Sequence, residues 1–186
     1  LSNSFVSQVF QDHDGFMWVA TRNGLDRYDG YRFKIYKRED GKSGLTSNFI
    51  NCLFEDKAHT LYIGTNLTVQ KYNGESFDTL RLIGPTGQPI HSYINDIQQC
   101  RNGDLLIGTS GSGLMRVEGE CTAHTIAGLP SALLHIKRIL EDKQGRLWVI
   151  TAFHGLYCLK GKKVVGHYFY NKQMSNALRD ISIDRK

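Results

Sequence analysis

A pattern of about 43 residues repeats along this 186-residue chain, and it limits the possible folds more than any other feature. Its clearest copy runs from Gly15 to Gly30 (GFMWVATRNGLDRYDG). One large apolar position recurs at steps of 44, 44 and 42 residues, and a threonine three residues after it keeps the same steps. The four copies of these two positions are Trp18, Tyr62, Leu106 and Trp148, and Thr21, Thr65, Thr109 and Thr151. A fixed period of this length indicates a repeat architecture.

Each unit is predicted to form four short strands. In the first unit, β-rich runs are separated by Asp12-His13-Asp14-Gly15, Asn23-Gly24 and Asp29-Gly30, residue types that form tight turns. The alternation of aromatic or aliphatic and basic residues from Tyr31 to Tyr36 indicates a half-exposed outer strand. Strands joined in this way lie antiparallel in chain order, as a meander.

The predicted fold is all-β. Four units cover residues 4–36, 48–82, 92–126 and 135–170, and the first strand of a fifth unit is predicted within residues 176–186. A four-stranded meander cannot bury both of its faces alone, whereas radial stacking around an axis buries them in a β-propeller. The sequence therefore predicts an incomplete propeller of about four blades plus one strand. An open solenoid of sheets is the weaker alternative, and the repeated Trp18 position is expected to pack between neighbouring blades.

Charge and cysteine content exclude several functions. The net charge is +5, and basic residues are concentrated in the first unit, where most are expected in loops or on the outward face. No basic helix and no exposed sheet face of interleaved aromatic and basic residues is predicted, so nucleic-acid binding through this chain is not expected. The four cysteines lack paired C-x-x-C spacing, which argues against a zinc site and a disulfide framework.

The motif search predicts no catalytic residue, no metal site and no cofactor. The seven histidines show no H-x-x-x-H or H-x-H spacing. The segment from Asp12 to Gly15 resembles the start of a calcium loop but lacks the distal glutamate, so it is interpreted as a turn. There is no G-x-S-x-G elbow, and no glycine-rich phosphate loop opens a helix. Paired carboxylates for glycoside hydrolysis remain an open alternative.

The loops suggest a binding face. If the first strand of each unit lines the axis, the loops between second and third strands and the loops between units lie at one end of the propeller. Aromatic rings there could cover the apolar face of a sugar, while polar side chains supply directional hydrogen bonds. The candidate ligand-binding residues are Arg22, Asn23, Asn66, His91, Tyr93, Ser112, Phe153 and His154.

Two runs carry a family resemblance. Asp142–Thr151 (DKQGRLWVIT) and Asp12–Thr21 (DHDGFMWVAT), the latter followed by Gly24–Gly30 (GLDRYDG), resemble the two-component regulator propeller repeat. The third unit departs from it, with Cys100 and Leu106 in place of aspartate and tryptophan. The resemblance implies the N-terminal, extracytoplasmic sensor region of a bacterial hybrid two-component histidine kinase/response regulator. Such receptors commonly detect oligosaccharides and control polysaccharide-utilisation genes.

The resemblance also implies partners and a location. An oligosaccharide ligand, the remaining blades and a second propeller of the same chain are expected, in the periplasm, with membrane anchoring and kinase activity in parts outside this sequence. The chain has no 18-residue apolar run, and it begins at Leu1 with neither an initiator Met nor a signal-peptide pattern, so an excised fragment is expected.

Two questions remain open at the level of sequence. Exposed sheet edges predict homodimers or aggregation involving residues 177–183. The rival functions are a protein interaction scaffold that uses the same end of the propeller and, less favoured, a carbohydrate-active propeller enzyme.

Overall fold

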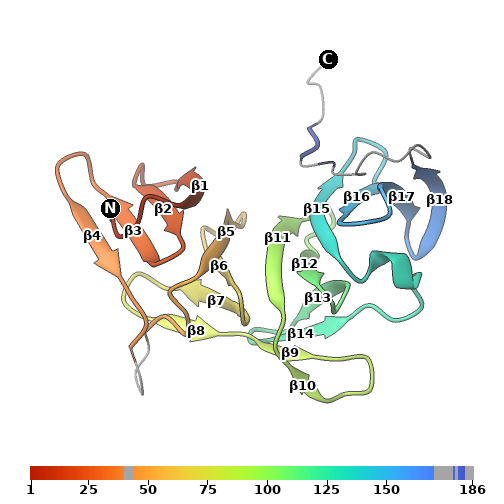
Figure 1. Cartoon of the computed structure of the whole chain (residues 1–186), viewed down its shortest axis with the longest axis horizontal. Coiled ribbons are helices and arrows are strands. Elements are labelled where there is room, and N and C mark those ends of the chain that lie inside the picture. The colour runs from red at the N-terminus through yellow and green to blue at the C-terminus, as the bar shows by residue number, and fades with distance from the viewer. Residues whose placement is uncertain (40–43, 170–177, 179, 183–186) are drawn as a thin grey trace.

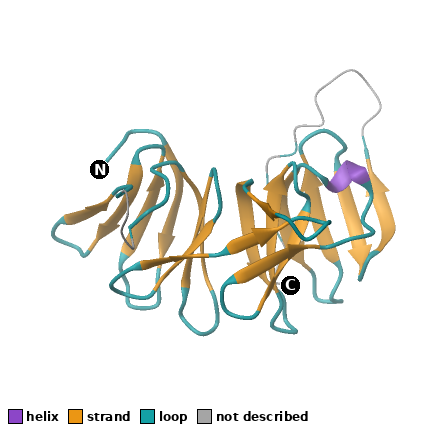
Figure 2. Cartoon of the chain, turned by 90° about the horizontal axis from the view of Figure 1, so that it is seen from below, coloured by secondary structure: helices purple, strands orange, loops and turns teal. Residues whose placement is uncertain are grey.

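The computed structural model describes residues 1–39, 44–169, 178 and 180–182, and these residues form four β-sheets (Figures 1 and 2). The first sheet contains β1 (Val6–Gln11), β2 (Met17–Thr21), β3 (Gly24–Tyr28) and β4 (Phe33–Tyr36). The second contains β5 (Ile50–Glu55), β6 (Leu61–Thr65), β7 (Val69–Tyr72) and β8 (Phe77–Thr79). The third is built on β11 (Tyr93–Gln99), β12 (Leu105–Ser110), β13 (Leu114–Glu118) and β14 (Thr122–Thr125). The fourth contains β15 (Ile136–Glu141), β16 (Leu147–Thr151), β17 (Leu156–Lys160) and β18 (Lys163–Tyr168).

The sheets are arranged as blades of a propeller, which confirms the predicted fold class. Consecutive strands pair antiparallel within each blade, and the first strands β1, β5, β11 and β15 lie next to one another along the inner side of the arc (Figure 1). The turns between the second and third strands of every blade therefore lie at one end of the propeller. The turns between the first and second strands lie at the other end. One short 3₁₀ helix, Ser131–Leu133, precedes the fourth blade. No helix in the described ranges combines the length and apolar character needed to span a membrane.

The third sheet differs from the expected four strands. Residues predicted as the end of the second unit and a linker form β9 (Arg81–Ile83) and β10 (Pro89–Ile90). β9 pairs in parallel with β14, so this hairpin extends the outer edge of the third blade to six strands. Pro85 and Gly87 correctly indicated a loop between β9 and β10. The pairing of β9 with β14 could not be predicted from the residues around β9, because β14 is distant in the sequence.

The core consists of three apolar layers, each between two neighbouring blades. Trp18 lies in the layer between the first and second blades, Tyr62 between the second and third, and Leu106 between the third and fourth. The prediction that this repeated position packs between blades is confirmed for these three copies. Trp148 stacks instead on Tyr168 of its own blade, with ring centroids 5.8 Å apart.

The face of the first blade that points away from the second blade carries apolar side chains that no other blade of the described residues covers. Val6 and Val9 are 44% and 55% exposed, whereas Ile94 and Ile97, their counterparts in the third blade, are 0% and 3% exposed. The first blade thus presents the inner-strand surface that is buried between blades elsewhere in the chain. The predicted fifth unit, and the edge at residues 177–183, lie largely outside the described residues.

Candidate ligand-binding face

A buried threonine fixes the turn between the second and third strands in each of the four blades. The hydroxyls of Thr21, Thr65, Thr109 and Thr151 donate hydrogen bonds of 2.8–3.0 Å to the carbonyl of the residue at the start of the third strand or immediately before it. The same hydroxyls accept backbone N–H groups from the turns, at 3.1 Å from Asn23, 3.1 Å from Ser112 and 2.9 Å from His154. The repeated threonine therefore holds three of the predicted ligand-binding residues through their backbones, and their side chains can vary.

Arg22 and Tyr93 are brought together through aromatic rings. The Arg22 guanidinium carbon lies 5.3 Å from the ring centroid of Phe5 and 5.4 Å from that of Phe49. The Phe49 ring in turn meets Tyr93 edge to face, with centroids 5.9 Å apart. Burial raises the pKa of Tyr93, and the charge of Arg22 acts in the opposite direction. We call Phe5, Arg22, Phe49 and Tyr93 the aromatic cluster.

Next to the aromatic cluster, an open hollow of ≈ 510 Å³ lies at the propeller axis. Each inner strand carries a β-bulge at the same place, because its pairing with the second strand shifts by one residue. The extra residue in each strand is Ser7, Asn51, Asn95 or Lys137. All four line the hollow together with Tyr93. Bulges redirect side chains, and here they bring four polar side chains of three types to one place.

In the first and third blades, the residue that follows the bulge residue is polar and forms hydrogen bonds with the inner strand of the next blade. The Gln8 amide donates to the Leu53 carbonyl at 3.1 Å and accepts from the Leu53 N–H at 2.8 Å. Asp96 occupies the equivalent position in the third blade and accepts the Ile139 N–H at 2.7 Å. These contacts fix the spacing of the strands that form the hollow.

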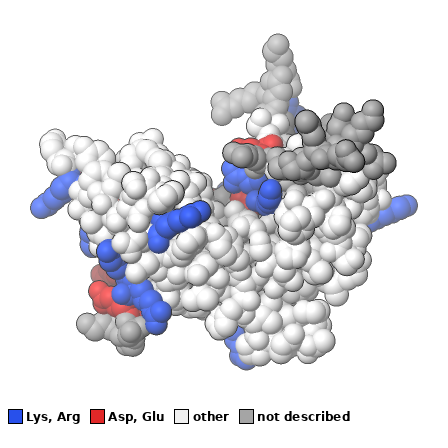
Figure 3. Space-filling model, viewed as in Figure 1, with Lys and Arg blue, Asp and Glu red and all other residues white. Residues whose placement is uncertain are grey.

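Charged side chains also connect the inner strands of the third and fourth blades. The Arg138 guanidinium bridges Asp96 at 3.1 Å and Asp180 at 3.0 Å. Burial raises the pKa of Asp96, while the Ile139 N–H and Arg138 favour its ionised form. Figure 3 shows basic side chains next to acidic ones on the β15 side of the molecule. The hollow is therefore lined by charged side chains on one wall, and Tyr93 of the aromatic cluster lies on another.

The other predicted residues lie at the same end but not in the hollow. Asn66 accepts a 2.7 Å hydrogen bond from the Ser47 hydroxyl. Phe153 packs against His135 at 5.4 Å in the fourth blade, and the His154 carbonyl bonds the His167 ring at 2.7 Å. His91 lines a separate hollow of ≈ 290 Å³. Of the eight predicted residues, only Tyr93 lines the axial hollow, and Arg22 lies beside it against the ring of Phe49 without lining it. Whether any of them binds a ligand stays a prediction.

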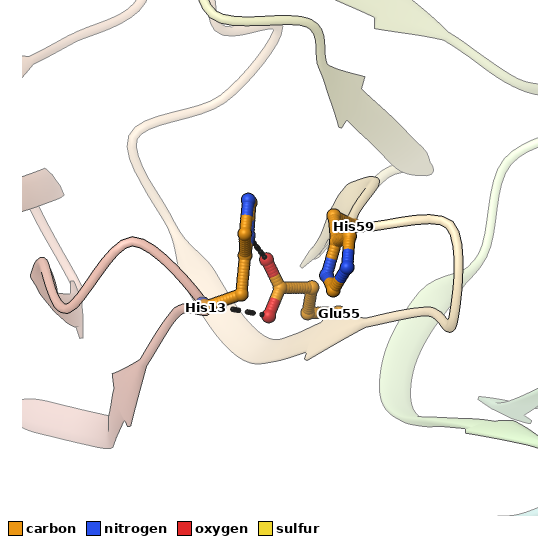
Figure 4. A group of neighbouring side chains, drawn as sticks. All are labelled: His13, Glu55 and His59. Atoms are coloured by element: carbon orange, nitrogen blue, oxygen red, sulfur yellow. Dashed lines mark hydrogen bonds and ion pairs between the residues drawn. The ribbon is translucent and has the colours of Figure 1, made fainter.

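Sequence reasoning missed the bulge residues and a group of metal-ligand types at the opposite end. His13, Glu55 and His59 offer ligand atoms that all lie within 4.8 Å of one another (Figure 4). His13 and His59 are 46 residues apart, close to one repeat, so the absence of local histidine spacing did not exclude a shared site. The hydrogen bond to Glu55 raises the pKa of His13. A search for ligand residues about one repeat apart would have found this group.

Comparisons with known proteins agree with the repeat pattern. The family model described as two-component regulator propeller matches residues 1–23, 44–67 and 131–153. A 45-residue segment is 49% identical to "Histidine kinase P4" of Formosa agariphila, and it covers 23% of this chain and 3% of that protein.

Solved structures share the fold. The extracellular domain of a protein described as a hybrid two-component system from B. thetaiotaomicron superimposes with a TM-score of 0.74 at 22% identity, over 87% of this chain and 24% of that one. Virginiamycin B lyase from Staphylococcus aureus gives a TM-score of 0.66 at 15% identity, over 95% of this chain and 59% of that one. The chain thus spans only a small part of its sequence relative and about a quarter of the B. thetaiotaomicron domain. The chain has the fold of an incomplete β-propeller, and three of its segments match the two-component regulator propeller model.

Proposed function

We propose that this chain is part of the ligand-sensing propeller of a hybrid two-component receptor, that it lies outside the cytoplasm, and that its ligand is an oligosaccharide. The family model and the similarity to a histidine kinase support a role in signal transduction. The fold shared with an extracellular domain supports the location. Control of polysaccharide-utilisation genes belongs to the same proposal.

The observation that carries the sugar proposal is the axial hollow with four bulge residues and Tyr93 on its walls. Sugars are recognised by an aromatic surface against the apolar ring face and by polar groups that pair with hydroxyls. Tyr93 of the aromatic cluster supplies the first, and Ser7 and Lys137 supply the second. Because the bulge residues are a serine, two asparagines and a lysine, the hollow is asymmetric and can distinguish the parts of a ligand.

Not all lining residues are equally suited to a test. Asn51 and Asn95 donate to the carbonyls of Ile94 and Ile136 in the next blade, at 3.0 and 2.6 Å, so they also hold the blades together. Tyr93 is 37% exposed at the beginning of β11, and Lys137 lies at the bulge of β15. Replacing either of these two leaves the hydrogen bonds between blades in place.

A thermal-shift screen of the chain against plant and host oligosaccharides tests the proposal. We expect at least one oligosaccharide to raise the melting temperature, and we expect Tyr93→Ala and Lys137→Ala to remove that shift. Stabilisation by a protein partner and by no sugar would favour the interaction scaffold. Sugar cleavage measured by product analysis would favour an enzyme, an alternative kept open because virginiamycin B lyase shares the propeller fold.

A further inference from the structure

A histidine–glutamate–histidine group joins the first two blades at the end of the propeller opposite the aromatic cluster. His13 lies in the turn between β1 and β2, Glu55 ends β5, and His59 lies in the turn between β5 and β6 (Figure 4). Their ligand atoms lie within 4.8 Å of one another. We propose that these three residues bind a divalent transition-metal ion, with Zn²⁺ as the best match. This inference is independent of the proposed sugar site.

The ligand types suit such an ion, and small side-chain movements would bring the ligand atoms to the distances that it requires. Two imidazole nitrogens and one carboxylate oxygen form a ligand set found in three-ligand zinc sites, with metal–ligand bonds of about 2.0–2.2 Å. Tetrahedral ligands at those bond lengths are separated by about 3.3 Å. His13 Nδ1 and Glu55 Oε1 are 2.6 Å apart, so a metal ion would replace the proton that they share, and the two atoms would move slightly apart.

Neighbouring groups already orient two of the ligands. The Nε2 atom of His13 lies 3.3 Å from the Asp14 carboxylate, which directs the Nδ1 atom of the same ring toward Glu55. Metal-binding histidines commonly use a carboxylate on the second ring nitrogen in this way. The second Glu55 oxygen accepts the backbone N–H of His13 at 3.0 Å. Glu55 is therefore held by both the ring and the backbone of the same histidine.

His59 departs from the repeat at this position. The equivalent residues in the other three units are Gly15, Gly103 and Gly145, with φ of 88°, 93° and 72°. His59 has φ of 64° and is the one non-glycine residue with positive φ in the described ranges. Strained backbone is often retained at functional sites. Here the strained backbone places an imidazole where glycine would have no side chain, with its ring stacked 3.9 Å from that of His13.

The surroundings leave room for the ion and for solvent. The group faces a hollow of ≈ 480 Å³ between the first and second blades. Four other charged residues line this hollow, the acidic Asp12 and Asp14 and the basic Arg27 and Lys71. Their charges act on the site in addition to that of Glu55. A fourth coordination position would be open to water. Because its ligands come from two blades, the ion would join the first blade to the second.

Metal binding can be measured on the 186-residue chain after treatment with a chelator. Titration calorimetry with Zn²⁺ should give about one ion per chain, and Co²⁺ should give the visible absorption of a low-coordinate nitrogen–oxygen site. Affinity should rise between about pH 6 and pH 8, because the ion displaces a proton from the histidines. No saturable binding of either ion would overturn the proposal.

Three variants and one control locate the site. His13→Ala, Glu55→Gln and His59→Gly should each weaken Zn²⁺ binding by at least about tenfold. His59→Gly is the sharpest of these, because it restores the residue of the other repeats and should not lower the melting temperature of the metal-free chain. His124→Ala, which removes a histidine 4.0 Å from Glu118 in the third blade, should bind Zn²⁺ like the unmodified chain. Equal binding by His59→Gly and the unmodified chain would place the ion elsewhere and overturn the proposal.

Discussion

The indole N–H of Trp18 donates a 2.6 Å hydrogen bond to the carboxylate of Asp12, which begins the turn before β2. The fourth blade repeats this contact between Trp148 and Asp142 at 2.8 Å. In the second blade, the hydroxyl of Tyr62 donates to Asp56 at 3.2 Å, and burial together with the Asp56 charge raises the pKa of Tyr62 to about 12.

The third blade lacks both partners. Cys100 and Leu106 replace the aspartate and the aromatic donor, so neither position leaves a buried polar group unpaired. Both residues line a hollow of ≈ 450 Å³ between the third and fourth blades. The loss of the hydrogen-bond acceptor at Cys100 and the loss of the donor at Leu106 therefore compensate each other.

Asp12→Ala should lower the free energy of unfolding by about 1–3 kcal/mol, because the Trp18 indole loses its hydrogen-bond acceptor. Asp12 also accepts the Phe16 N–H at 2.8 Å. Urea unfolding of the variant measures the loss, and Glu75→Ala in an exposed turn serves as control. Equal stability of the two variants would show that the aspartate is not needed at this turn.

Gly108→Ala should destabilise the chain by about 1–3 kcal/mol through overpacking. A Cβ atom there would lie 2.7 Å from Cγ2 of Ile136, a fully buried residue of the next blade. Combining it with Ile136→Ala should cost less than the sum of the two single changes, as measured by urea unfolding. Strictly additive losses of unfolding free energy would mean that the two positions are not in steric contact.

The His13–Glu55 pair should stabilise the metal-free chain more in acid than in base. The hydrogen bond raises the pKa of His13 above 6.5, so this stabilisation is complete below pH 6.5 and is lost as the pH rises through the pKa of the folded state. Melting temperatures in chelator should show a larger loss for His13→Gln at about pH 6 than at about pH 9. In a Glu55→Gln background that difference should disappear, and its persistence would assign the effect to another group.

Self-association is expected through the uncovered face of the first blade. Val9→Lys places a charge on the surface that corresponds to a buried layer elsewhere, and it should shift a dimer or larger species toward monomer in sedimentation velocity. Leu67→Lys, at an exposed turn position 37% accessible to solvent, is the matched control. A clean monomer for the unmodified chain would refute the expected dimer.

The repeat predicted the blades because the Trp18 position, the Thr21 position and the turn glycines report local packing and turn geometry. It did not predict β9 pairing with β14, since that pairing joins segments about 40 residues apart. The bulge residues were also missed, because alternation along a strand does not show which residue is the extra one. Ligand groups such as His13 with His59 come from different units, so only the stacking of blades brings them together.

Isothermal titration calorimetry with an oligosaccharide that stabilises the chain tests the central claim most directly. We predict a saturable isotherm whose affinity falls by at least about tenfold in Tyr93→Ala and in Lys137→Ala, and stays unchanged in Lys160→Ala at the exposed end of β17, the third strand of the fourth blade. Unchanged affinity in the first two variants, or no heat of binding with any member of the oligosaccharide panel, would contradict a sugar site at the axial hollow.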